Sequence, residues 1–138
     1  IGSRVRGAVR AALRVHDVRS ARISVIGVSD KRMAQLNQRH LGHHGSTDVL
    51  TFDLTDGEAE VEGEIVLSLD TARREAGRRG HALSSEAALY AVHGTLHLLG
   101  YDDHEPRQAN KMHNKEDEIL TSIGLGAVYS RGAKARPR

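Results

Sequence analysis

The stretch that most constrains the fold is residues 84–98, which are apolar almost all round when they are set on a helix. Ser84 or Ser85 can cap its start, and the alanines, leucines and valine that follow leave almost no polar face. A helix of this kind belongs in the interior of a domain. It nevertheless carries two imidazoles, His93 and His97. Their buried nitrogens need partners, and a bound metal ion would supply them.

The spacing of the two histidines predicts a metal site at the end of this helix. Residues four apart point from the same face, so both imidazoles can reach one ion. Gly100 follows where it can end the helix, and the turn brings Asp102, Asp103 and His104 toward the same point. A core or capping role would explain the helical pair equally well on its own. The turn and the third histidine favour a hydrolytic zinc site with an open fourth position.

Composition limits the ligands. The chain has no Cys, which excludes disulfides and thiolate-bound zinc and leaves His and carboxylates as the strong ligands. Three imidazoles suit Zn²⁺, but nickel and copper accept the same ligands. A rival pair, His43 and His44, lies in a Gly-bounded loop, where neighbouring histidines are more often exposed to solvent.

The whole chain predicts an α+β fold. Its 138 residues suffice for one domain with a real core and are too few for two. The patterns suggest one mixed β-sheet with helices on both faces, and place the metal site on the central helix and the following turn. We expect residues 1–130 to form the domain and residues 131–138 a flexible basic tail. The predicted helices are 3–16, 30–40, 70–79, 84–98 and 107–122, and the predicted strands are 22–28, 47–52 and 63–68.

Positive charge collects at the two ends of the chain, although the net charge is only +2. Residues 1–22 hold six arginines against one acid, Asp17, and residues 131–138 hold no acid at all. Basic segments favour a polyanion such as RNA. A solvated helix face and a disordered tail would explain the same residues equally well.

The sequence gives no sign of membrane attachment. No apolar run approaches 18 residues and no signal peptide opens the chain, which favours a cytoplasmic protein. Because the first residue is Ile1 and not Met, we expect the natural start to lie upstream. No feature of the sequence indicates the oligomeric state.

Three blocks of sequence occur in an order that is typical of one family. Residues 93–104 read HGTLHLLGYDDH, residues 47–52 read TDVLTF after Leu36-Asn37, and residues 63–68 read GEIVLS. In these blocks the chain resembles the YbeY family, metal-dependent endoribonucleases of ribosomal RNA maturation, whose last signature is H-G-x-L-H-L-x-G-Y-D-H. The resemblance covers about residues 23–120.

The resemblance implies a zinc-dependent endoribonuclease that hydrolyses phosphodiester bonds in single-stranded RNA. It implies a role in 3′-end processing of small-subunit ribosomal RNA and in ribosome quality control, with ribosomal RNA or the small subunit as partner. His93, His97 and His104 would hold one zinc ion, which would lower the pKa of a bound water toward about 7. Asp102 would accept a hydrogen bond from one of these imidazoles on the side away from the metal, and so orient the ring.

Two positions depart from the family pattern. The family's third His falls on Asp103, and His104 comes one residue later. We favour His104 as the ligand, because a loop can absorb one residue, and keep Asp103 as the alternative. The family Arg that is taken to bind phosphate falls on Leu41, and Arg39 could replace it. Residues 47–48 either line the cleft or begin the strand.

Two other functions fit parts of the pattern. Zinc peptidases share the His-x-x-x-His spacing but place a Glu after the first His as general base, whereas this chain has Gly94. That residue weighs heavily against proteolysis. An RNA-binding ribosome assembly factor with a structural metal is the non-enzymatic alternative, and the loss of the family Arg keeps it open.

Overall fold

The elements follow the predicted order. The computed structural model describes residues 1–41, 48–57 and 60–130. The predicted loop with His43 and His44, and the predicted basic tail, lie outside the described residues. In chain order the elements are α1 (Gly2–Val15), β1 (Ala21–Val28), α2 (Asp30–Leu41), β2 (Val49–Asp53), β3 (Val61–Ser68), α3 (Leu69–Arg79), α4 (Leu83–Leu98) and α5 (Pro106–Ser122).

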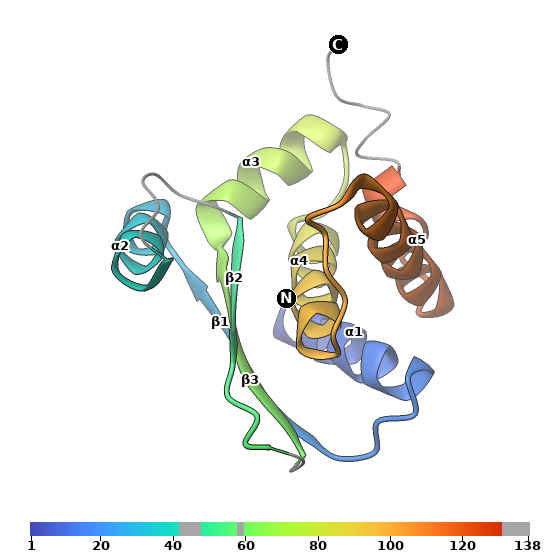
Figure 1. The fold of residues 1–138 in the computed structure, drawn as a ribbon. Helices are drawn as coiled ribbons and strands as arrows, with labels where there is room; N and C mark the ends of the chain where they lie inside the picture. The colour runs from blue at the N-terminus through green and yellow to red at the C-terminus, as the bar shows by residue number, and fades with distance from the viewer. Residues whose placement is uncertain (42–47, 58–59, 131–138) are drawn as a thin grey trace.

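The sheet is mixed, as predicted, with strand order β1-β3-β2. Strand β1 runs parallel to β3 and β2 runs antiparallel to it, so that Ile65 pairs with Val25 on one side and Thr51 on the other. Both faces of β3 are covered. Leu67 packs into the main core with α4, and Val66 packs against α2 through Met33. Figure 1 shows α1, α4 and α5 on one side of the sheet and α2 on the other.

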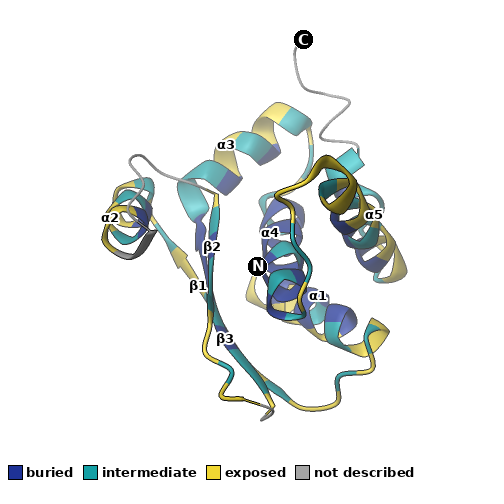
Figure 2. Cartoon of the chain, viewed as in Figure 1, coloured by how far each residue is buried: buried dark blue, intermediate teal, exposed yellow. Residues whose placement is uncertain are grey.

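Helix α4 is the interior helix that the sequence predicted, and Figure 2 shows it buried between the sheet, α1 and α5. The predicted serine caps are wrong. The helix begins at Leu83, before both serines, and the backbone carbonyl of Ala82 accepts the N–H of Ser85 at 3.0 Å.

In the described parts of the chain, no helix is both long enough and apolar enough to cross a membrane.

The end of α4 is set by Gly100, as predicted. Its φ of 101° lies in the left-handed region, which Gly adopts without strain. The N–H of Gly100 then bonds the carbonyl of His97 at 3.0 Å, and the N–H of Tyr101 bonds the carbonyl of Leu96 at 2.9 Å. This turn reverses the chain directly beside the second helical histidine.

Two glycines let α4 lie directly on β3. A Cβ on Gly94 would stand only 2.9–3.0 Å from three side-chain atoms of Ile65, and a Cβ on Gly63 would stand 2.5 Å from Leu98. Carbon atoms in contact are normally 3.5–4.0 Å apart, so a larger residue at either position would push helix and strand apart. This close contact fixes the position of the histidines that flank Gly94.

Candidate metal site and cleft

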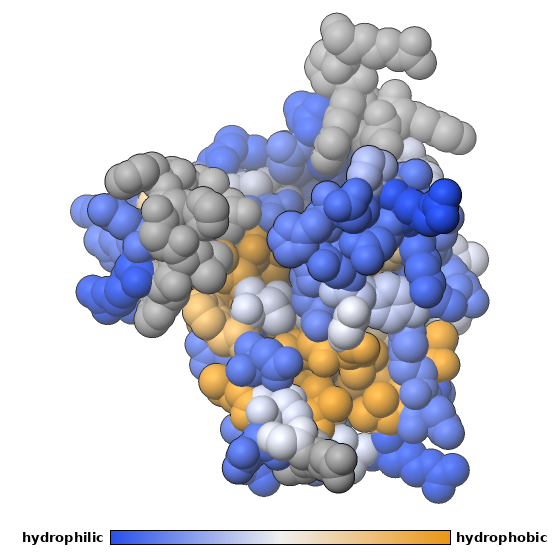
Figure 3. Space-filling model, in the orientation of Figure 1, coloured by the Kyte–Doolittle hydropathy of each residue, from blue (hydrophilic) through white to orange (hydrophobic). Residues whose placement is uncertain are grey.

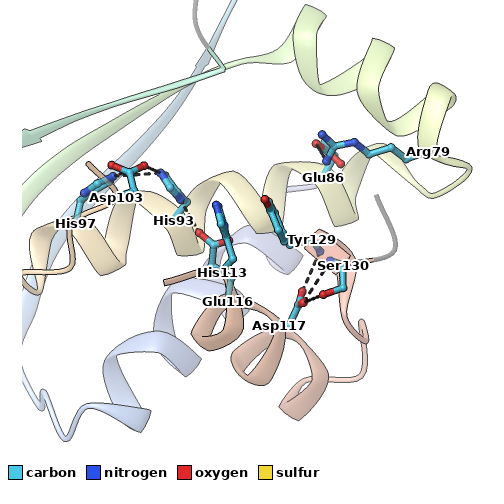
Figure 4. Close-up of polar contacts among 10 residues, drawn as sticks. All are labelled: Arg79, Glu86, His93, His97, Asp103, His113, Glu116, Asp117, Tyr129 and Ser130. Atoms are coloured by element: carbon cyan, nitrogen blue, oxygen red, sulfur yellow. Dashed lines mark hydrogen bonds and ion pairs between the residues drawn. The ribbon is translucent and has the colours of Figure 1, made fainter. Parts of the chain in front are cut away.

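The two helical histidines converge with one acid from the following turn (Figure 4). The Nε2 atoms of His93 and His97 lie 3.1 Å apart. The Oδ2 atom of Asp103 lies 3.4 Å from the first and 3.7 Å from the second. These three side chains come from the last turns of α4 and from the turn after it.

The hydrogen bonds on the far side of each ring decide which nitrogen faces the site. His93 Nδ1 donates to the Glu116 carboxylate, and His97 Nδ1 donates to the backbone carbonyl of Tyr101 at 3.0 Å. Both partners only accept, so each neutral ring carries its proton on Nδ1 and its lone pair on Nε2. Two lone pairs then face each other at 3.1 Å, beside an acid. The repulsion is relieved by a metal ion between the nitrogens, or by a proton that one ring gains on Nε2 and donates to the other.

The geometry of the three atoms fits a divalent metal. Zinc bonds of about 2.0–2.2 Å in a tetrahedral site place the ligand atoms roughly 3.3–3.6 Å apart. The observed separations of 3.1, 3.4 and 3.7 Å bracket that range. The side chains of His97 and Asp103 are 29% and 36% exposed, so the site also has an open side.

That open side faces a cleft of about 520 Å³ between β2 and the end of α4. Val49, Leu50, Thr51 and Leu98 form much of its wall, and Asp48 and Asp53 add acids. On the face drawn in Figure 3, apolar side chains gather between the sheet and the helices, and the surface around them is hydrophilic. A flexible chain segment could therefore reach the three converging side chains from solvent.

Glu116 supports the site from the interior. Its side chain is 1% exposed, and it accepts hydrogen bonds from His93 and, at 2.7 Å, from Nδ1 of His113. Burial alone would raise the pKa of Glu116, but the two histidines outweigh it and hold the pKa below its ordinary value. Glu116 is therefore ionised at neutral pH.

The charge on Glu116 acts on His93 in turn. Burial alone would lower the pKa of His93, but the hydrogen bond and charge of Glu116, with help from Asp103, leave the pKa above its ordinary value. A raised pKa means a more basic imidazole. A basic ring is a better metal ligand once its Nε2 is unprotonated.

A second cluster, His93, His113 and Glu116, also brings ligand atoms close together. Each oxygen of Glu116 already accepts a hydrogen bond from one of the rings, so this cluster is satisfied without an ion. The ring of His113 in addition stacks on Tyr129, with centroids 3.6 Å apart. We therefore assign Glu116 and His113 to positioning His93.

His104 lines the same cleft, but the structure does not bring its ring nitrogens to the three converging side chains. Its side chain is 84% exposed and pairs with Asp102, whose carboxylate also accepts the backbone N–H of His104 at 3.1 Å. Asp102 thus orients the ring of His104 and neither of the helical histidines. The position beside His93 and His97 is taken by Asp103, the alternative ligand from the sequence. His104 stays a predicted ligand that would require the turn to rearrange.

The structure also keeps Arg39 away from the three converging side chains. Arg39 is exposed on α2, which packs on the face of the sheet opposite α4. It is not among the described residues that line the cleft, whereas Asp48 is. A role for Arg39 in phosphate binding stays a prediction, and the side chain of Leu41 lies outside what the structure describes.

Sequence reasoning missed Glu116 and His113. A signal was present, because Glu116 falls on the apolar stripe of α5 that Met112, Ile119 and Leu120 form. An acid on a buried stripe requires a partner. Nothing local identified that partner as a histidine 23 residues earlier in the chain.

Gly94 explains in structural terms why the peptidase motif does not fit. It lies on the side of α4 that contacts β3, with Ile65 against it. A Glu at this position would enter the core and could not reach the cleft. The general base of a zinc peptidase therefore has no equivalent at this position.

Comparison with known proteins gives a consistent result. Residues 2–124 match the family model described as Endoribonuclease YbeY. An Endoribonuclease YbeY from Anaeromyxobacter sp. is 42% identical over 119 residues, which cover 84% of this chain and 62% of that relative. One from Wolinella succinogenes is 47% identical over 103 residues, which cover 75% of this chain and 72% of that relative. The solution structure of a Thermotoga maritima protein matches 88% of this chain and 85% of its own, with a TM-score of 0.58 and 25% identity.

Proposed function

Because this chain belongs to the YbeY endoribonuclease family, we propose that it cleaves single-stranded RNA with a divalent metal held by His93, His97 and Asp103. One observation carries the proposal. The far-side hydrogen bonds of both imidazoles leave two Nε2 lone pairs facing each other beside an acid, at the wall of an open cleft. A divalent cation fits this donor set.

A divalent ion held by these side chains would polarise a phosphoryl oxygen and increase the acidity of water next to it. The residues of the chain have separate parts in this scheme. Glu116 and the carbonyl of Tyr101 hold the two rings in the tautomer that directs Nε2 to the cleft. Asp48 lines the cleft beside the three ligands, where its carboxylate can accept a proton from attacking water.

We propose zinc as the metal, because two imidazoles, a carboxylate and an open position form a common catalytic zinc set. The ligand set differs from the three imidazoles expected at first. With a carboxylate in place of one imidazole, manganese and iron become competitors alongside nickel and copper. We also propose ribosomal RNA of the small subunit as the substrate and the cytoplasm as the location, on the strength of the family resemblance.

One observation favours an RNA-binding assembly factor as the second candidate. Among the described residues that line the cleft, there is no Lys or Arg to stabilise charge on a phosphate. Arg79 lines the adjoining hollow, but its guanidinium bonds Glu86 at 3.1 Å. A metal that only holds the turn in place would satisfy the same three side chains.

The test is cleavage of a fluorescent single-stranded RNA by the native chain, His97→Ala and His104→Ala, each with and without chelator. We expect His97→Ala and the chelator to abolish cleavage and His104→Ala to retain it, with circular dichroism showing that all three stay folded. Cleavage that survives both chelator and His97→Ala would refute metal-dependent catalysis. A folded, metal-loaded native chain that binds RNA and leaves it intact would favour the assembly factor.

A further inference from the structure

A second hollow surface lies between α1 and β1, away from the metal site. Two adjoining hollows of about 470 and 460 Å³ share Arg10 and Leu13 and follow the length of α1. Val5, Val9 and Ile23 form an aliphatic floor. We call this surface the α1 groove.

The α1 groove is lined by arginines without acidic partners. Arg6, Arg10 and Arg14 are exposed and line it. In the parts of the chain that the structure describes, no carboxylate lies within ion-pair distance of these three. The one acid on its rim, Asp17, lies 3.9 Å from Arg19. The α1 groove therefore carries a net positive charge that nothing in the described chain neutralises.

The spacing of these arginines works against the helix itself. They stand four residues apart, so their guanidiniums are neighbours on one face and repel each other. Exposed residues with good helix propensity, such as Gln, would avoid this repulsion at no loss of packing. A binding partner with negative charges spaced along a line would remove the repulsion, since four residues advance a helix by about 6 Å.

We infer that the α1 groove is a second binding surface for single-stranded RNA, with phosphates on Arg6, Arg10 and Arg14 and bases against the aliphatic floor. This inference rests on the proposed function, which supplies a polyanion as substrate. Guanidiniums bind phosphate strongly and in a fixed geometry. Single strands are held by positively charged grooves that follow the backbone.

The position of the α1 groove gives it a distinct role. It borders β1, and the metal-site cleft borders β2, at the other edge of the three-stranded sheet. Helix α1 packs against the first half of α4 through Val5 and Val9, and the converging histidines lie on its second half. An RNA must therefore be long to occupy both surfaces at once, so the α1 groove would improve the cleavage of long strands only.

The test uses the full chain in which Arg6→Gln, Arg10→Gln and Arg14→Gln are combined. The matched control combines Arg32→Gln, Arg73→Gln and Arg107→Gln, which remove the same charge from exposed positions on α2, α3 and α5. Binding of a labelled 30-nucleotide RNA is measured in EDTA across a salt series, so that it does not depend on catalysis. Cleavage of the same RNA and of a 5-nucleotide RNA is measured separately.

We expect the α1 variant to bind the long RNA at least 10-fold more weakly at low salt. Its slope of log K against log salt should fall by about 2, which is three contacts at about 0.7 each. In cleavage, KM should rise for the long RNA only, with kcat unchanged and a Tm no lower than that of the native chain. The control variant should bind within 3-fold of the native chain.

Equal binding and equal salt slopes for the two variants would overturn the inference. So would a polyglutamate peptide that competes with the long RNA as well as unlabelled RNA does, because the α1 groove would then suit an acidic protein. If no RNA is cleaved by the native chain, the proposed function fails. The binding series in EDTA still decides the role of the α1 groove.

Discussion

Replacing Glu116 by Ala should weaken metal binding without touching a metal ligand. The carboxylate accepts hydrogen bonds from His93 and His113 in the interior, and it fixes the proton of His93 on Nδ1. Without it, that N–H has no acceptor, and the proton gains nothing by staying on Nδ1. The tautomer with the proton on Nε2 then competes, and its lone pair points away from the site.

The size of the effect follows from this role. Loss of an outer partner of a metal-binding histidine typically costs 10- to 100-fold in affinity, about 1.4–2.8 kcal/mol. Glu116→Ala should fall in that range, because it removes both the acceptor and the charge that raises the pKa of His93. Glu116→Gln should lose less metal affinity than Glu116→Ala. The amide oxygen of Gln can still accept the hydrogen bond from His93 Nδ1 if His113 changes tautomer.

Isothermal titration of the metal-free protein with Zn²⁺ measures both variants. The control is Glu118→Ala on the same helix, where the side chain is 61% exposed and pairs with Lys115. Nitrogen NMR of the metal-free proteins reports the tautomer of His93 independently of binding. Native affinity in a folded Glu116→Ala protein, or a Glu116→Gln protein weaker than Glu116→Ala, would refute the reasoning.

Three further predictions follow from other contacts. Gly94→Ala should lower the free energy of unfolding by up to about 2 kcal/mol, because an overpacking cost of about 1–3 kcal/mol is offset by a helix-propensity gain of about 1 kcal/mol. Urea unfolding measures this loss, which should be smaller in a protein that also carries Ile65→Val. If the effects of the two substitutions on the free energy of unfolding simply add, the two residues are not in contact as described. Asp30 accepts hydrogen bonds from Ser68, Thr71 and Arg74, which hold its pKa at about 2, below its ordinary 3.8. The ionised Asp30 therefore stabilises the fold above pH 4, and this stabilisation is lost as the pH falls toward 2. Asp30→Asn should have a lower free energy of unfolding than the native chain at pH 7 and the same one near pH 2. A difference between the two proteins that does not change with pH would be inconsistent with this. Asp103→Asn should reduce Zn²⁺ affinity and His104→Ala should not, and the opposite result in calorimetry would make His104 the third ligand.

Much of the fold could be predicted because its signals are local. The apolar residues of α4, the four-residue spacing of its histidines and the glycine that ends it lie within 18 consecutive residues. The element order and the mixed sheet with helices on both faces followed from periodicity in the same way. The start of α4 was not predicted correctly. The sequence offered Ser84 and Ser85 as caps, but the helix begins before them, and the backbone carbonyl of Ala82 accepts the N–H of Ser85.

The sequence by itself determined that two imidazoles would converge on a buried helix beside an acidic turn, and it identified the family. Only the tertiary structure decided that Asp103 and not His104 lies beside them, because a turn of a few residues can direct either side chain inward. Only the packing of α5 on α4 revealed Glu116 behind His93, and only the placement of α2 across the sheet separated Arg39 from the cleft. These are contacts between segments far apart in the chain, and periodicity and spacing carry no information about which of them form.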